Sequence, residues 1–176
     1  MENPIEHIPP PGALLLLSPW ADITASHEGT HPDCSAMKNN FADYLISPNV
    51  ELGQWTIKAF LGPMGLDEGR ENPYISPASL ALKPERLEGL FKGFPRTYIV
   101  AGGAERILDE IRTLRDRMFK DLNWERPAEV EDEGEKMDWV TYDEVDDAVH
   151  DFLMFPWLQP EVNDTFRRIS QWVANL

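Results

Sequence analysis

The chain has 176 residues, 42% of them hydrophobic, which is enough for one domain with a buried core. Its formal net charge of −15 disfavours nucleic acid and anionic membrane surfaces as partners, because both would repel it. The single cysteine, Cys34, excludes an internal disulfide. The acidic, proline-rich start lacks the features of a secretory signal, and the longest aliphatic run is too short to span a bilayer. We therefore expect one cytoplasmic domain.

Three apolar segments are expected to form a mostly parallel sheet. Residues 12–17 are a continuous aliphatic run, which is typical of a strand buried on both faces. Residues 96–101 form a second such segment and end at Gly102-Gly103, and residues 139–142 form a shorter third one. Helical segments lie between and after them, and this alternation predicts an α/β layered fold. Three strands are few for such a sheet, so we expect an exposed sheet edge.

The expected helices have apolar residues at helical spacing. Residues 41–61 suggest two short helices broken around Pro48, after a polar loop at 25–40. The longest helix repeats apolar positions from Ile107 to Leu122. The last helix spans residues 161–174, and a short one is expected at residues 84–90. The apolar face predicted for the last helix consists of Val162, Phe166, Ile169, Trp172 and Val173.

Two polar clusters are weak candidates for binding sites. Residues 125–147 contain eleven acidic and two basic residues, which we interpret as a solvated loop rather than a cation or partner site. A second cluster matches no zinc-binding spacing, so no metal or other cofactor is predicted. Its members are His27, His31, Asp33 and Cys34.

Glu105 and His150 are the stronger candidates for chemistry. Glu105 follows the second expected strand and starts a helix, at the carboxyl end of a parallel strand where ligands bind in open α/β sheets. A purely structural role at the helix start is the alternative. His150 follows the third strand, and histidine is the usual general base near neutral pH. An acid followed by a histidine matches the last two members of the serine, acid, histidine order of α/β-hydrolases.

Four stretches together carry a family resemblance: LLLLSPWADIT, NPYISPASL, FPRTYIVAGGAERILDEIRTL and AVHDF. In this order and spacing, the chain resembles the C-terminal part of the hormone-sensitive-lipase-like α/β-hydrolases, especially fungal esterase and deacetylase-like members. The resemblance implies one partial domain over residues 1–176. Within it, residues 12–24 match the first strand and SPWAD turn, 41–66 a cap or pocket wall, and 96–176 the part with the acid and histidine.

The resemblance implies that Glu105 is the catalytic acid and His150 the general base. Most members of the family have aspartate where this chain has Glu105, and glutamate is chemically competent there. Asp109, one helical turn later, is the alternative acid. The resemblance also suggests that Ser18 and Asp22 are scaffold, with the aspartate bonding nearby backbone.

The resemblance also suggests a pocket for a small hydrophobic ester or acyl substrate. The candidate lining residues lie between the first two strands, and plain core packing is the alternative for them. These residues are Trp55, Phe60, Leu61 and Met64.

No serine of the chain has the G-x-S-x-G pattern of a nucleophile turn, and no glycine-rich oxyanion loop is present. We therefore expect no esterase activity from this polypeptide alone. It could be a fragment of a gene, a pseudoenzyme or one part of a complemented enzyme. The rival hypothesis is a non-catalytic binding or interaction module, whose exposed first strand pairs with a partner chain or a second copy and whose pocket wall holds an apolar ligand.

Overall fold

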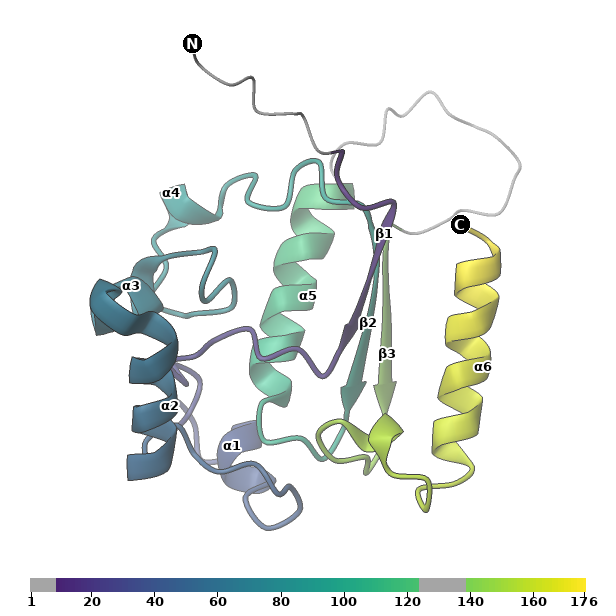
Figure 1. Ribbon diagram of the computed structural model, residues 1–176, viewed down its shortest axis with the longest axis horizontal. Coiled ribbons are helices and arrows are strands. Elements are labelled where there is room, and N and C mark those ends of the chain that lie inside the picture. Colours follow the sequence, from purple (N-terminus) through teal and green to yellow (C-terminus); the bar gives the residue numbers. More distant parts are fainter. Residues whose placement is uncertain (1–8, 124–138) are drawn as a thin grey trace.

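The computed structural model describes residues 9–123 and 139–176 (Figure 1). Its described part contains one sheet of three parallel strands in the order β1-β2-β3. The strands are β1 (Ala13–Leu17), β2 (Arg96–Gly102) and β3 (Val140–Val145). In register, Ile99 of β2 lies between Leu16 of β1 and Tyr142 of β3. The sheet and its strand order along the chain agree with the predicted α/β class.

One helix covers each face of the sheet. Figure 1 shows the sheet nearly edge-on, with α5 (Leu108–Asn123) on one side and α6 (Glu161–Ala174) on the other. Because successive side chains of a strand point to opposite faces, β2 contributes alternate residues to two separate cores. Ile99 and Ala101 pack in the core on the α5 side. Tyr98 and Val100 pack with α6 in the other core.

The long connection from β1 to β2 forms a set of short helices on the α5 side of the sheet. They are α1 (Ser35–Lys38), α2 (Glu51–Leu61), the 3-10 helix η1 (Gly62–Met64), α3 (Leu66–Glu71) and α4 (Pro84–Leu87). A second 3-10 helix, η2 (Phe152–Met154), follows β3. None of the helices in residues 9–123 and 139–176 is long and apolar enough to cross a bilayer.

The prediction of two helices in residues 41–61 is wrong. Only α2 forms there, and residues 41–50 are turns and irregular chain. The apolar residues that suggested the first helix do not share a buried face, because Phe41 and Tyr44 are 97% and 56% exposed. The first turn of α2 packs directly on this chain at Gly53, where a Cβ would come within 2.6 Å of the Pro48 Cα. The short α1 lies where a polar loop was expected.

The apolar face predicted for α6 is only partly correct. Val162 and Ile169 are buried against the sheet, and fully buried Thr165 completes this face. Phe166 and Val173 remain 47% and 50% exposed. They lie beside the helix's contact line with the sheet, so periodicity alone groups them with residues that the sheet covers.

Most of the predicted acidic segment at residues 125–147 lies outside the described residues. Within β3, its carboxylates are paired with arginines of the two covering helices. Asp143 accepts a hydrogen bond from Arg168 at 2.8 Å, and Glu144 accepts one from Arg112 at 3.0 Å. These acids therefore tie β3 to α6 and α5.

Helix α5 also buries a carboxyl group, that of Glu110, which is 4% exposed. Its Oε2 has no hydrogen-bond partner among the described residues. Burial raises the pKa of Glu110 well above its usual range, and the negative charges of Asp22 and Glu105 act in the same direction, although a backbone hydrogen bond from Asp22 opposes them. The neutral acid is consequently the form that this site favours.

Glu110→Gln should stabilise the protein increasingly as pH rises. The unfolded Glu110 ionises near its ordinary pKa of about 4.3, whereas the folded one holds its proton to higher pH, so folding loses stability between these two values. Glutamine cannot titrate and escapes this loss. Urea unfolding followed by circular dichroism, from about pH 5 to about pH 7, measures the difference in unfolding free energy between variant and wild type.

The matched control is Glu88→Gln, because Glu88 is exposed. Its difference from the wild type should stay constant over the same pH range. If the difference in unfolding free energy between Glu110→Gln and the wild type is equally independent of pH, the burial of a neutral acid is contradicted.

Candidate functional site

The ends of β2 and β3 approach each other closely, and glycine makes this possible. A Cβ on Gly102, the last residue of β2, would collide with the carbonyl oxygen of Ala148. At Gly103, a Cβ would lie 3.2 Å from the Asp146 Cα. The turn after β2 and the loop after β3 therefore lie directly against each other. This contact brings Glu105 and His150 to the same point at the carboxyl end of the sheet.

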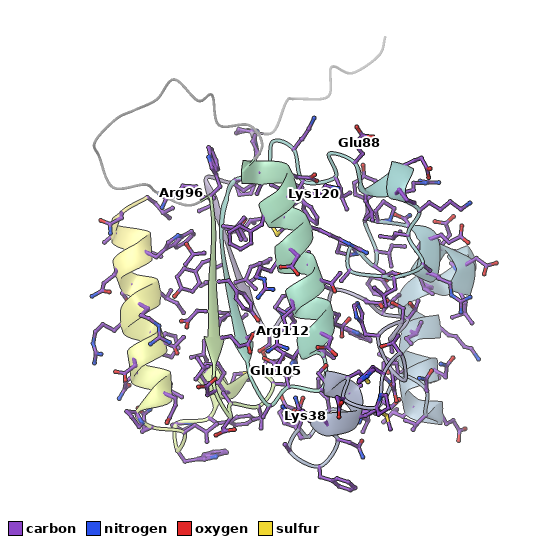
Figure 2. The ribbon with its side chains drawn as sticks, turned by 180° about the vertical axis from the view of Figure 1, so that it is seen from behind. Lys38, Glu88, Arg96, Glu105, Arg112 and Lys120 are labelled. Atoms are coloured by element: carbon purple, nitrogen blue, oxygen red, sulfur yellow. The ribbon has the colours of Figure 1, made fainter. Side chains whose placement is uncertain are left out.

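The Glu105 carboxylate is fully buried and contacts the histidine ring. Its Oε2 lies 3.1 Å from Nδ1 of His150. Its Oε1 accepts hydrogen bonds from Ser18 Oγ, at 2.7 Å, and from the Gly102 backbone N–H. Figure 2 shows Glu105 at the end of the sheet toward which the strand arrows point. Each of its two oxygens therefore has a partner, as a buried carboxylate requires.

The His150 ring is mostly buried, with 14% of its side chain exposed. Its second nitrogen, Nε2, lies 3.4 Å from Oδ2 of Asp151. Burial by itself lowers the pKa of His150, but the hydrogen bond and charge of Glu105, together with the charges of Asp151 and Asp43, outweigh it. The net result is a pKa above the ordinary histidine value, so this ring holds a proton more tightly than a free histidine does.

A loop segment between β1 and β2 holds both partners from the other side. The Asp43 carboxylate accepts hydrogen bonds from the backbone N–H groups of Arg106, at 2.7 Å, and His150, at 3.4 Å. The Asn39 amide donates to the Glu105 carbonyl at 2.8 Å. The sequence gives no signal for these contacts, because each joins residues more than 60 positions apart and neither Asn39 nor Asp43 belongs to a motif.

The other polar candidates have separate roles. Asp109 lies in the first turn of α5, where its carboxylate accepts a hydrogen bond from the Ser35 N–H at 2.7 Å rather than from His150. Asp22 bonds nearby backbone, as expected, with the N–H groups of Thr24 and Ser26 as donors. Ser18, expected to be scaffold, contacts the Glu105 carboxylate and is therefore part of the site.

A cavity of about 180 Å³ lies beside His150. None of the four residues predicted to form a pocket lines it. Leu61 is buried with Ile23 and Ile57 in a small core of its own, while Trp55, Phe60 and Met64 are at least half exposed. The residues lining the cavity are Trp20, Leu45, Ile46, Pro48, Gly53, Thr56, Ile107 and His150.

The histidines near Cys34 are placed apart from this site. His27 Nε2 lies 3.1 Å from the Ala78 carbonyl, and exposed His31 lies 3.6 Å from the Asp33 carboxylate. Cys34 is buried. Over the described ranges 9–123 and 139–176, no three histidine, cysteine or acidic side chains are grouped so that they could hold a metal ion.

Solved structures match this fold, although no protein-family model and no curated protein sequence matches the chain. A hormone-sensitive lipase from a metagenome library aligns with 96% of the chain at 23% identity and a TM-score of 0.64. An esterase/lipase from an uncultured bacterium aligns with 96% of the chain at 21% identity and a TM-score of 0.63. An esterase from the bacterial hormone-sensitive lipase family aligns with 94% at 23% identity and a TM-score of 0.63.

The chain spans less than half the length of these proteins, 45%, 44% and 44% respectively. At such identities the likeness shows the fold alone. The three parallel strands with their flanking helices correspond to part of the fold of these hydrolases, which confirms the predicted fold class.

Glu105→Gln should lower the pKa of His150. The amide removes the negative charge that raises this pKa, while burial, which lowers it, remains. The pKa of His150 is higher in the folded protein than in the unfolded chain, where it is about 6.5. The contact with Glu105 therefore stabilises the wild type fully below about pH 6.5, and this stabilisation is lost as the pH rises through the folded pKa. NMR titration of the His150 ring protons measures the pKa directly.

Asp109→Asn provides the control, since Asp109 is the alternative acid and bonds Ser35 instead. It should leave the His150 titration unchanged. A shift in Asp109→Asn of the same size as in Glu105→Gln would show that the pairing is wrong.

Proposed function

We propose that Glu105 and His150 are the acid and the general base of a serine-type hydrolase acting on carboxylic esters. The observation that carries this proposal is the 3.1 Å contact between the buried Glu105 Oε2 and His150 Nδ1, at the carboxyl end of two adjacent parallel strands. The nucleophile and the oxyanion donors of this reaction would come from outside the 176 residues. This function is consistent with the resemblance to esterase structures, of which the chain spans less than half.

In this mechanism, the Nδ1–H of His150 donates to Glu105 Oε2 and thereby fixes the tautomer. The lone pair on Nε2 then takes the proton of an attacking hydroxyl that displaces the Asp151 carboxylate from its 3.4 Å contact with this nitrogen, and the buried Glu105 carboxylate stabilises the resulting imidazolium. The imidazolium next gives this proton to the leaving alkoxide. A water molecule repeats the sequence on the acyl intermediate. The raised pKa of His150 supports this role, because it makes the ring a better proton acceptor.

The serines of this chain do not suit the role of nucleophile. The hydroxyl closest to the pair is that of Ser18, which is 5% exposed and donates to Glu105 rather than to His150 Nε2. The other six serines each form a side-chain hydrogen bond elsewhere. These six serines are Ser26, Ser35, Ser47, Ser76, Ser79 and Ser170. The chain alone should therefore be inactive.

The cavity beside His150 suggests the class of substrate. No lysine, arginine, aspartate or glutamate is among its lining residues, and its volume of about 180 Å³ suits a small group. We expect an uncharged ester with a short acyl or alcohol part, because an ionised group would lose its hydration there and would find no charged partner in the lining other than a protonated His150.

A second candidate function is that of a non-catalytic interaction module. It is favoured by β1, which pairs with β2 alone in the described sheet and leaves Leu15 and Leu17 41% and 42% exposed. An edge strand with exposed leucines is prone to pair with another chain or a second copy. Association of the purified chain, measured by light scattering, would favour this function, whereas a monodisperse monomer would count against it.

Ester hydrolysis should appear only when the missing part is supplied. We suggest a chimera in which residues 9–176 replace the aligned segment of the metagenomic hormone-sensitive lipase. This chimera should hydrolyse p-nitrophenyl butyrate, and His150→Ala or Glu105→Gln within it should reduce kcat on the order of 10⁴-fold or more. The initial rate of p-nitrophenol release provides the measurement.

In the chimera, Asp109→Asn serves as the matched control and should retain activity. The unmodified chain should release p-nitrophenol no faster than buffer. If the unmodified chain hydrolyses the ester and this turnover disappears in His150→Ala, the prediction that the chain is inactive by itself is wrong. A folded chimera whose activity survives both the His150 and Glu105 substitutions would contradict the assigned roles.

A further inference from the structure

Ser18 connects the ends of all three strands. It lies one residue beyond β1, and its backbone N–H donates to the Val100 carbonyl of β2 at 2.9 Å. Its hydroxyl donates to Glu105 Oε1 at 2.7 Å and accepts a hydrogen bond from the Asp151 N–H at 3.1 Å. Asp151 directly follows His150 in the loop after β3. One hydroxyl therefore touches both the acid and the chain that carries the histidine.

We propose that Ser18 is a positioning residue that holds the Glu105 carboxylate and the His150 ring in contact. This inference rests on the proposed function, in which that contact fixes the histidine tautomer. Ser18 does not touch the reacting atoms itself. Its hydroxyl acts through Glu105 on one side and through the backbone of Asp151 on the other.

The geometry shows why this hydroxyl matters. A carboxylate turns about its last side-chain bond, so the direction in which Oε2 points depends on what holds Oε1. Ser18 and the Gly102 N–H together hold Oε1. Without the hydroxyl, one donor to a fully buried carboxylate is lost, and the Asp151 N–H loses its acceptor. Both partners of the 3.1 Å contact are then less constrained.

The backbone of Ser18 supports the same conclusion. Its φ of 41° lies in the left-handed region, which serine adopts at an energetic cost and glycine adopts freely. Such a conformation persists only where the surrounding structure holds it. Here the residue has three hydrogen bonds to fixed partners, two of them through the hydroxyl. Glycine would suit the backbone better but would remove the hydroxyl.

The test is NMR of the ¹⁵N-histidine-labelled full chain, in which ring nitrogen shifts report the tautomer of neutral His150. The variants are Ser18→Ala and Ser18→Gly, with Glu105→Gln as the reference for a broken pair. In the wild type, Nδ1 should carry the proton. In both Ser18 variants, the ratio of the Nδ1–H to the Nε2–H tautomer should fall by about tenfold, the size expected for loss of a hydrogen bond to a charged group.

The matched control is Ser76→Ala, because Ser76 is also a buried serine and its hydroxyl oxygen accepts a hydrogen bond from the Ile23 N–H at 3.2 Å. It should lower stability and leave the His150 tautomer as in the wild type. A loss of packing alone would affect Ser76→Ala and Ser18→Ala alike, so the tautomer separates positioning from a general structural role.

Two results would overturn the proposal. If Ser18→Ala and Ser18→Gly keep the wild-type tautomer while Glu105→Gln loses it, Ser18 does not position the pair. Unfolding of both Ser18 variants also counts against it, since the hydroxyl would then serve the fold as a whole. If Glu105→Gln keeps the wild-type tautomer too, the pair itself fails, and with it the proposed function.

Discussion

The arrangement of this chain depends on the burial of one carboxylate, that of Glu105. A buried charge is costly unless donors surround it, and the effective penalty is several kcal/mol per ion. The donors here come from the ends of three different strands: Ser18 after β1, Gly102 at the end of β2 and His150 after β3. The carboxylate therefore links the whole sheet at its carboxyl end, and the site exists only when all three strands are in register.

The surrounding structure packs closely around this carboxylate. The bare backbone at Gly102 lets the loop after β3 approach the turn after β2, which no side chain there would permit. The chain between β1 and β2 covers the opposite side, where Asp43 binds the N–H groups of Arg106 and His150. Arg106, itself 6% exposed, pairs with Glu28 at 2.9 Å and fixes that chain in place. The connection between β1 and β2, which contains helices and loops but no strand, thus forms one wall of the site.

Sequence reasoning could identify the pair because its signals are local. Each member follows a strand, and parallel strands bring their carboxyl ends to one edge, so Glu105 and His150 had to lie near each other. The choice of Glu105 over Asp109 comes instead from the family resemblance. In the structure Asp109 lies in the first turn of α5 and bonds Ser35, 74 positions away, a contact that local sequence does not reveal.

The rest could not be predicted, because it depends on contacts between distant segments. Nothing in the sequence around Ser18 or Asp43 shows that its side chain meets residues more than 60 positions away. Helical periodicity indicated which residues share a face, but not what that face meets. Trp55 and Phe60 therefore proved largely exposed, while the cavity beside His150 is lined in part by Leu45 and Ile46, which belong to irregular chain.

The most direct test of the central claim is a double-mutant cycle between Glu105 and His150. Unfolding free energies of the wild type, Glu105→Gln, His150→Ala and the double variant are measured near pH 6, where the histidine carries its proton. We expect the effects of the two single substitutions to be non-additive, with a coupling energy of about 1 kcal/mol or more that decreases at higher pH. Additivity within about 0.5 kcal/mol at both pH values would contradict it.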